Sequence, residues 1–418
     1  MHLYDAPAVF VLVGAALYVV LGGADFGAAL WQLLAGGGER GERLREHAHR
    51  SMAPVWEANH VWLIFILTIT WTAYPVAFGS IASTLAVPLF IAAVGIIFRG
   101  ATYALRSAEP TGRQRRLIDT GFSISSIIAP FALGAAIGAI AARRVPVGNA
   151  AGALFSSWLN PIAVLVGVLA VAFGGYLAAV YLAADAVRSG DRDLEDAFRA
   201  RALIAGVIAG GVAAAGLIVL ASDAHHLYRR LVEGPGLPAL LLSVVAGVAT
   251  LWLVWARRFR EARWCAALAV AAVIAGWGLA QQPLILPRLT LARAAAGHDT
   301  LVAVIVVVLG GAIILLPSLA LLFRLALTGR LDDSQDASSR VPSATERALG
   351  SPGGLFARAA AACLIAGFGL LTIADAAWAH AVGVTCLFGF VITGYVAIAP
   401  HRIAGDSRPA PPDQRWAP

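Results

Sequence analysis

The sequence predicts an all-α polytopic membrane protein. Of its 418 residues, 59% are hydrophobic and only 13% are charged. Apolar runs long enough to cross about 30 Å of hydrocarbon recur from one end of the chain to the other. Arginines gather in alternate connections between these runs, which is typical of a chain that crosses a membrane repeatedly.

Nine apolar segments before residue 324 are each expected to form a spanning helix, because each is close to the length that a bilayer requires. They comprise residues 8–34, 53–71, 80–98, 120–142, 161–184, 202–221, 238–256, 264–280 and 301–323. Two further segments, 359–374 and 377–398, are expected to form a helical hairpin that turns at Asp375. The first run lacks both the basic region and the cleavage site of a signal peptide, so we expect it to be retained.

The distribution of arginine predicts the orientation. The chain contains no lysine, and 25 of its 31 arginines fall in the connections near 35–52, 99–119, 185–201, 257–263 and 324–358 and in the C-terminal tail. The positive-inside rule places these segments in the cytoplasm, with the N-terminus outside and the C-terminus cytoplasmic. Because the net charge of +7 is spread over these separate connections rather than over one basic face, we expect the bilayer, and no nucleic acid, as a partner.

Composition divides the chain into four parts. Residues 1–326 are predicted to be a transmembrane domain, and 327–356, which are polar and rich in Ser and Asp, a cytoplasmic linker. Residues 357–400 hold the extra transmembrane hairpin, and 401–418 are expected to be a disordered cytoplasmic tail.

Asp25 is the first candidate functional residue, because it interrupts the apolar run that contains "GGADFGAALW". A lone charge in hydrocarbon costs several kcal/mol, so intramembrane acids usually have a function. Asp25 lies about 14 Å from the cytoplasmic end of its helix at 1.5 Å per residue. We favour a proton-carrying role; the alternative is a protonated Asp that joins helices through hydrogen bonds, aided by the small residues Gly22, Gly23 and Gly27.

A second polar cluster, "PVWEANHVW", enters the next span from the arginine-rich side. Glu57 and His60 are three residues apart and share a helix face, while Trp56, Asn59 and His60 form an overlapping strip. Because the first two spans are antiparallel neighbours, we expect Asp25 and Glu57 at adjoining depths, with proton transfer between them through water. The alternative is that Glu57 and His60 only form an ion pair near the headgroups.

The remaining residues offer no cofactor or catalytic site of their own. Of nine histidines, only His60 and His380 lie clearly within apolar segments, and they are expected near opposite sides of the membrane, which argues against a bis-histidine haem. The three cysteines lie inside apolar runs without metal-ligand spacing. We therefore predict no metal site and no catalytic residue in this chain.

Three motifs resemble subunit II of the cytochrome bd-type quinol oxidases. "GGADFG" resembles the family's D-G-F-D-x-G, "PVWEANHVWL" its P-x-W-D-G-N-x-V-W-L, and "WTAYPVAF" its aromatic-Pro turn before the third helix. The resemblance covers roughly the first 330 residues. Asp25 matches the second Asp of the first motif and Glu57 the Asp of the second, while Trp56, Asn59 and Trp62 match directly.

The resemblance implies two four-helix bundles plus a peripheral helix, packed against a haem-bearing subunit I in a bacterial plasma membrane. That partner would hold haem b, haem d and the quinol site of a respiratory chain enzyme that oxidises two quinols and reduces one O2 to water. This chain would bind no haem and would carry a proton pathway, which we assign to Asp25, Glu57, His60 and Asn59, supported by Trp56, Trp62, Gly23 and Gly27. A structural quinone and a small accessory membrane subunit are left open.

Three departures from the family pattern mark a divergent member with a C-terminal extension. Gly22 replaces the first acid of the first motif, so a proton route through that group is broken or rerouted. His60 stands where the family commonly has Glu or Gln, so an imidazole replaces a neutral or acidic group. The linker and hairpin extend beyond the family's usual end. Two other functions remain open: a proton-coupled secondary transporter, and a structural assembly subunit of another membrane redox complex.

Overall fold

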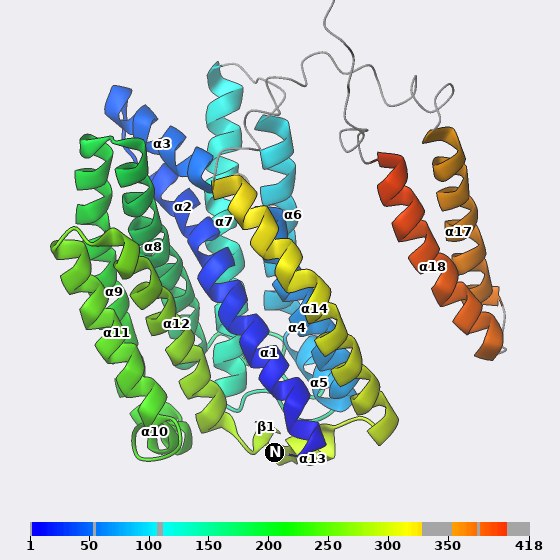
Figure 1. Ribbon diagram of the computed structural model, residues 1–418. Coiled ribbons are helices and arrows are strands. Elements are labelled where there is room, and N and C mark those ends of the chain that lie inside the picture. Colours follow the sequence, from blue (N-terminus) through cyan, green and yellow to red (C-terminus); the bar gives the residue numbers. More distant parts are fainter. Residues whose placement is uncertain (1, 53–55, 107–111, 328–352, 374–376, 399–418) are drawn as a thin grey trace, which may run out of the picture. The chain divides into compact units, whose positions relative to one another are not determined.

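The fold is described from a computed structural model, which covers residues 2–52, 56–106, 112–327, 353–373 and 377–398 (Figure 1). Within these ranges the chain is almost entirely helical and divides into two compact units, Met1–Leu319 and Ala320–Pro418. Each unit is described by itself. The predicted linker and tail, 327–356 and 401–418, lie almost wholly outside the described residues.

The first span is one continuous helix with a local change of winding. After the short 3₁₀ turn η1 (Leu3–Asp5), α1 (Ala6–Leu17) passes through the π-helical segment η2 (Tyr18–Gly22) into α2 (Gly23–Leu33). The connection that follows contains a helix, α3 (Gly38–Met52). Leu44 and Ala48 of α3 are buried while its charged residues face outward, so α3 caps one end of the fold, which we call the α3 end.

A first bundle joins α1–α2 to α4 (Trp56–Ala73), α5 (Pro75–Thr84), α6 (Ala86–Arg106) and α7 (Gly112–Ala141). The span predicted over 80–98 is formed by two helices rather than one, because α5 and α6 meet at an angle of 81°. Pro88 explains the break: it has no N–H to donate to the carbonyl of Thr84, and its ring crowds that carbonyl. The regular helical hydrogen bonds resume where the Leu89 N–H donates to the Leu85 carbonyl at 3.0 Å.

A second bundle contains α8 (Pro161–Ser189), α9 (Arg192–Asp223), α11 (Leu237–Trp255) and α12 (Phe259–Gln281), with the short α10 (His225–Val232) between α9 and α11. Asn160 caps α8 by accepting the Ala163 N–H at 3.1 Å, and Asp191 caps α9 through the Leu194 N–H at 3.1 Å. α8 lies at the centre of the unit, packed against α2, α7, α9 and α12 (Figure 1).

The unit ends in a peripheral helix. A two-stranded antiparallel ribbon, β1 (Leu284–Leu286) and β2 (Leu289–Thr290), leads through α13 (Leu291–Ala294) into α14 (His298–Leu327). α14 buries Leu301 and Val304 near its start and exposes most of its later apolar side chains. The arrangement is the predicted one of two four-helix bundles and a peripheral helix.

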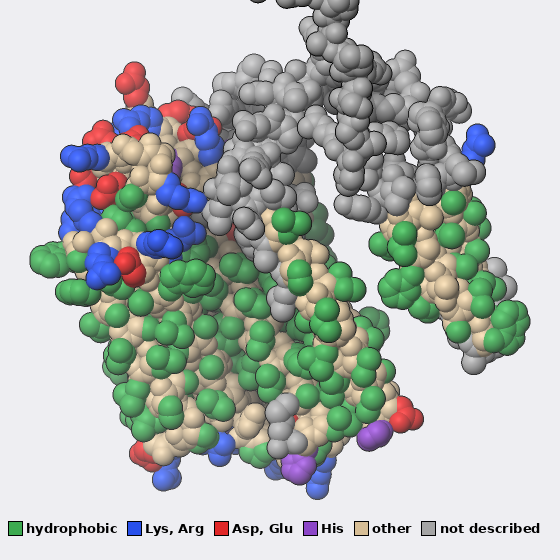
Figure 2. All heavy atoms as spheres, viewed as in Figure 1, with side chains coloured by type: hydrophobic (Ala, Val, Ile, Leu, Met, Phe, Trp, Pro, Cys, Tyr) green, Lys and Arg blue, Asp and Glu red, His purple; other side chains and the backbone are tan. Residues whose placement is uncertain are grey.

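The described helices are those of a membrane protein. Seven are long and apolar enough to span a bilayer, or eight if the bent α5–α6 pair counts as one span. The described apolar part of α4, Asn59–Ala73, is shorter than these. On the face seen in Figure 2, apolar side chains cover the middle of the unit and charged side chains gather at its two ends, with the larger group at the α3 end.

The second unit contains α17 (Gly353–Ile373) and α18 (Ala377–Ile398), which pack against each other at the positions of the predicted hairpin. Small residues permit this contact: a Cβ on Gly367 would lie 2.9 Å from the Leu387 side chain, and one on Gly389 would lie 3.2 Å from Cys363 Sγ. Their described apolar stretches, Arg358–Gly367 and Ala381–Thr393, are shorter than a full span.

Candidate functional site

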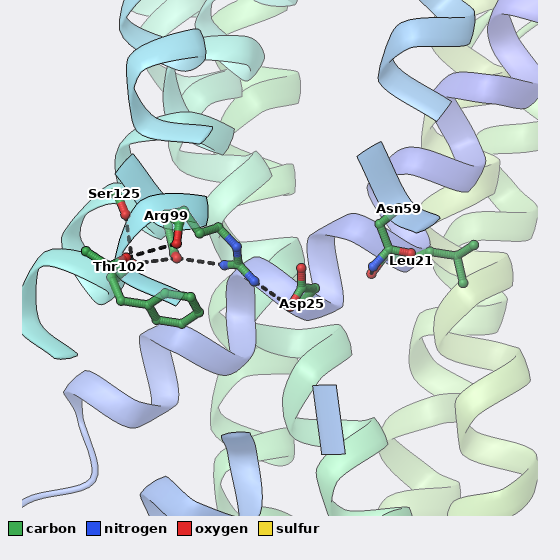
Figure 3. Close-up of polar contacts among 8 residues, drawn as sticks. Leu21, Asp25, Asn59, Arg99, Thr102 and Ser125 are labelled. Atoms are coloured by element: carbon green, nitrogen blue, oxygen red, sulfur yellow. Dashed lines mark hydrogen bonds and ion pairs between the residues drawn. The ribbon is translucent and has the colours of Figure 1, made fainter. Parts of the chain in front are cut away.

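Asp25 lies in the first turn of α2, directly after the π-helical segment, and is only 4% exposed. The wider winding interrupts the regular α-helical hydrogen bonds at this point, as is common at functional sites. The Leu21 carbonyl there accepts a hydrogen bond from Asn59 Nδ2 at 3.3 Å. Asn59 of α4 is thereby tied to the first span one turn from Asp25 (Figure 3).

Arg99 of α6 is the ion-pair partner of Asp25. Its Nη2 donates to Asp25 Oδ1 at 2.5 Å, and its Nη1 donates to Ser126 Oγ of α7 at 2.7 Å. The two charged side chains are 3% and 5% exposed. Figure 3 shows the Arg99 guanidinium extended across to the Asp25 carboxylate. Three helices are therefore joined through one buried, charge-assisted network.

Aromatic rings enclose this pair. The Arg99 Cζ lies 4.8 Å from the centroid of the Phe26 ring and 4.6 Å from that of Phe122, distances typical of cation–π contacts. Tyr18 and His60 pack edge-on against Phe26, with centroids 6.4 and 6.0 Å away. Because these rings exclude water from its sides, the Asp25–Arg99 attraction is stronger than that of a solvated pair.

His60 brings a titratable ring to the same cluster from α4. It interacts electrostatically with Asp25, and its ring lies 6.3 Å from that of Tyr18. The side chains of Trp56 and Glu57 lie outside the described residues, so the expected approach of Glu57 to Asp25 stays a prediction. Trp62 packs against the buried residues of the cluster and lies 6.2 Å, centroid to centroid, from Phe65.

Several buried polar atoms in the cluster make no hydrogen bond to the described residues. They are Tyr18 OH, Asp25 Oδ2, Asn59 Oδ1 and Arg99 Nε. Buried polar atoms are satisfied by protein groups or by ordered water. The cluster therefore has the donors and acceptors to bind water beside the one carboxylate oxygen that Arg99 does not hold.

Glycines bring α2 and α8 together next to the cluster. A Cβ on Gly27 would lie only 1.9 Å from the Gly174 carbonyl oxygen, and one on Gly23 would lie 3.8 Å from Gly174 Cα. Only glycine at 27 permits this approach of the two backbones. A Cβ on Gly22 would instead meet the Tyr18 ring at 3.3 Å and Asn59 Cβ at 3.8 Å, so position 22 borders the polar cluster.

Comparison with known proteins assigns the chain to a family. The model of the cytochrome bd terminal oxidase subunit II family matches residues 4–326. This chain belongs to that family. The predicted resemblance is confirmed, and the match ends close to the point where the sequence predicts that the linker begins.

Individual relatives agree with this assignment. The chain is similar to cytochrome bd-I ubiquinol oxidase subunit 2 of Escherichia coli K12, with 29% identity over 175 residues, which cover 39% of this chain and 44% of the relative. The same protein from Escherichia coli O157:H7 matches equally. The similarity thus spans less than half the length of these curated relatives.

A solved structure, that of bd oxidase from Geobacillus thermodenitrificans, shares the fold. It aligns with a TM-score of 0.62 at 24% identity, over 78% of this chain and 99% of the other. The uncovered part of this subunit II chain corresponds in size to the extension that follows the family domain.

Arg99 corrects the sequence analysis of this subunit II chain. The sequence assigns Arg99 to the cytoplasmic connection 99–119, among the arginines that predict the orientation. In the structure Arg99 lies inside α6 and is 2% exposed. Asp25 itself is the signal for Arg99, because an ionised carboxylate buried in hydrocarbon is stabilised by a counter-charge at a similar depth. Arg99 directly follows the apolar run "IAAVGIIF" and was the available cation.

The described residues contain no group of three or more His, Cys, Asp or Glu side chains that could hold a metal ion. The three cysteines, Cys265, Cys363 and Cys386, are free thiols. The titratable side chains that the structure brings together at Asp25 are a carboxylate, a phenol and an imidazole, from Asp25, Tyr18 and His60.

Proposed function

We propose that this chain is the haem-free second subunit of a bd-type quinol:oxygen oxidoreductase in a bacterial plasma membrane. Membership of the subunit II family over residues 4–326 carries the proposal. In this role the chain supports a haem-bearing subunit I, where quinol oxidation and the reduction of O2 to water take place. Haem b and haem d in that partner supply the redox chemistry.

The contribution of this chain is to bring cytoplasmic protons toward the site of oxygen reduction. α4 starts at the α3 end, which the arginine distribution assigns to the cytoplasm, and it carries Glu57, Asn59 and His60 in its first turns. Protons pass from Glu57 toward His60 and Asp25. Support comes from the position of His60, which interacts electrostatically with Asp25 deep in the bundle.

Within this route Arg99 positions the carboxylate. Arg99 holds Asp25 Oδ1, whereas Asp25 Oδ2 makes no hydrogen bond to the described residues. One oxygen thus anchors the group and the other exchanges protons with water or with His60. Gly22 removes the neighbouring acid of the family motif, so the route in this chain runs through α4 rather than along α2.

The absorption spectrum of the native complex tests the proposal. Purified from its membrane with the full chain tagged, the complex should contain a second large subunit and show haem b and haem d bands. A colourless homo-oligomer would contradict an oxidase subunit and support a proton-coupled transporter. A coloured complex without haem d would instead support an assembly subunit of another redox enzyme.

A further inference from the structure

Arg201 lies on α9 at the boundary between charged and apolar sequence. Residues 202–222 contain no charged side chain. On the same face of the helix, Ile204, Val207 and Ile208 are 58%, 65% and 54% exposed, as expected of a lipid-facing surface. Arg201 is thus the last charge on α9 before the hydrocarbon region, at the α3 end of the fold.

Two aromatic rings hold the Arg201 side chain in place. Its Cζ lies 5.8 Å from the centroid of Trp31 on α2 and 5.5 Å from that of Phe198 on α9. Trp31 is itself fixed, because its Nε1 donates to the Gly175 carbonyl of α8 at 2.8 Å. The guanidinium therefore sits on a rigid aromatic support formed by three helices.

The charge of Arg201 has no acidic partner among the described residues. Its Nη1 donates to the Ala197 carbonyl at 3.1 Å, which uses only part of a group with five N–H donors. Arg40 of α3 is close enough to repel it electrostatically. Several other arginines at this end do have an acidic partner, for example Arg43 with Asp191 and Arg258 with Glu261.

The position of this pair of arginines matches the headgroup level of a bilayer. Three tryptophans at the α3 end, Trp252, Trp255 and Trp264, are 57%, 65% and 77% exposed. Exposed tryptophans near the ends of spanning helices mark the membrane–water interface. This depth favours a lipid headgroup over a solute in bulk water as the anion that neutralises Arg40 and Arg201.

We propose that Trp31, Arg40 and Arg201 form a binding site for the phosphate of an anionic phospholipid in the leaflet at the α3 end. A guanidinium binds phosphate through two parallel N–H donors, a geometry that lysine lacks. The acyl chains lie along the exposed apolar face of α9 below Arg201. This site is independent of the redox role of the complex.

Native mass spectrometry of the intact complex, delipidated in detergent and titrated with phosphatidylglycerol or phosphatidylcholine, tests the proposal. The unmodified protein should retain phosphatidylglycerol several-fold better than phosphatidylcholine. Arg201→Gln should lose most of this preference. Arg258→Gln is the matched control, because it removes a cation from the same end whose charge Glu261 already neutralises, and it should bind as the unmodified protein does.

Equal retention of phosphatidylglycerol by Arg201→Gln and the unmodified protein would overturn the site, as would an equal loss in Arg258→Gln. Displacement of the lipid by millimolar inorganic phosphate would show a free-anion site instead. If Arg201→Gln does not fold, Arg40→Gln replaces it, since Arg40 is exposed on α3. Arg40→Gln should weaken binding, and unchanged binding would contradict the proposal.

Discussion

Two ion pairs of the same length lie in opposite environments in this protein. Arg99–Asp25 and Arg43–Asp191 both have an N···O distance of 2.5 Å. The first pair has side chains 3% and 5% exposed, whereas those of the second are 51% and 26% exposed. Distance alone therefore does not indicate what a pair contributes. Burial decides whether the loss of one partner leaves a charge in hydrocarbon or in water.

The comparison also separates two uses of charge. At the α3 end, arginines such as Arg43 pair with acidic residues at the surface, where water screens the charges. In the Asp25 cluster, the same types of group join α2, α6 and α7 and place a carboxylate deep inside the bundle. We therefore expect substitution to cost more stability in the buried pair than in the exposed one.

Asp25→Ala should have the largest effect on stability. It leaves Arg99 charged and buried without its partner, which costs about 3–5 kcal/mol. Arg43→Ala, which breaks the exposed pair, should change stability little. Thermal unfolding of the purified protein measures both variants. Asp25→Ala combined with Arg99→Leu should recover much of the loss, and a mild effect of Asp25→Ala alone would contradict the importance of burial.

Gly27→Ala should have the next largest effect. Its Cβ would lie 1.9 Å from the Gly174 carbonyl oxygen, so α2 and α8 must separate, at a cost of about 1–3 kcal/mol. Gly210→Ala is the control, because no atom lies within 4 Å of its Cβ. Replacing a mid-helix glycine there should stabilise the helix by roughly 0.5–1 kcal/mol. Similar melting temperatures for the two variants would argue against the close approach of α2 and α8.

The smallest expected effect is the pH dependence of the exposed pair. The Arg43 hydrogen bond, followed by the Leu194 N–H, lowers the pKa of Asp191 below its ordinary value of 3.8. A carboxyl group whose pKa is lower in the folded than in the unfolded protein stabilises the fold at pH values above its unfolded pKa. This contribution disappears as the pH falls through its folded pKa. The difference in melting temperature between the unmodified protein and Arg43→Gln should therefore shrink below about pH 4. A difference that stays constant would refute this origin.

The sequence predicted the spans well because hydrophobic length is a property of each segment. A helix stands at each of the nine predicted positions in the first 323 residues. The break between α5 and α6 was missed, although Pro88 was a visible signal. The π-helical winding at Tyr18–Gly22 leaves no distinctive signal in residue type, because aromatic, β-branched and small residues are common in apolar spans with regular winding.

The site was only partly predictable for a different reason. Asp25, Asn59 and His60 could be found because polar residues in an apolar run are conspicuous. Arg99 could not be found in this way, because it lies at the end of an apolar segment. Hydropathy does not distinguish a buried charge at that position from a charged loop residue. Pairing Asp25 with Arg99 requires two segments 74 residues apart to meet, and that is set by packing of α2 against α6 and α7.

Oxygen consumption by the purified complex tests the central claim most directly. Asp25→Asn and Glu57→Gln remove the proposed proton-carrying groups with little change in shape, and Arg258→Gln serves as the control. With an unchanged haem spectrum as proof of assembly, we predict slower quinol-driven oxygen reduction in the first two variants and normal turnover in the control. Full turnover in Asp25→Asn and Glu57→Gln would contradict a proton route through this subunit.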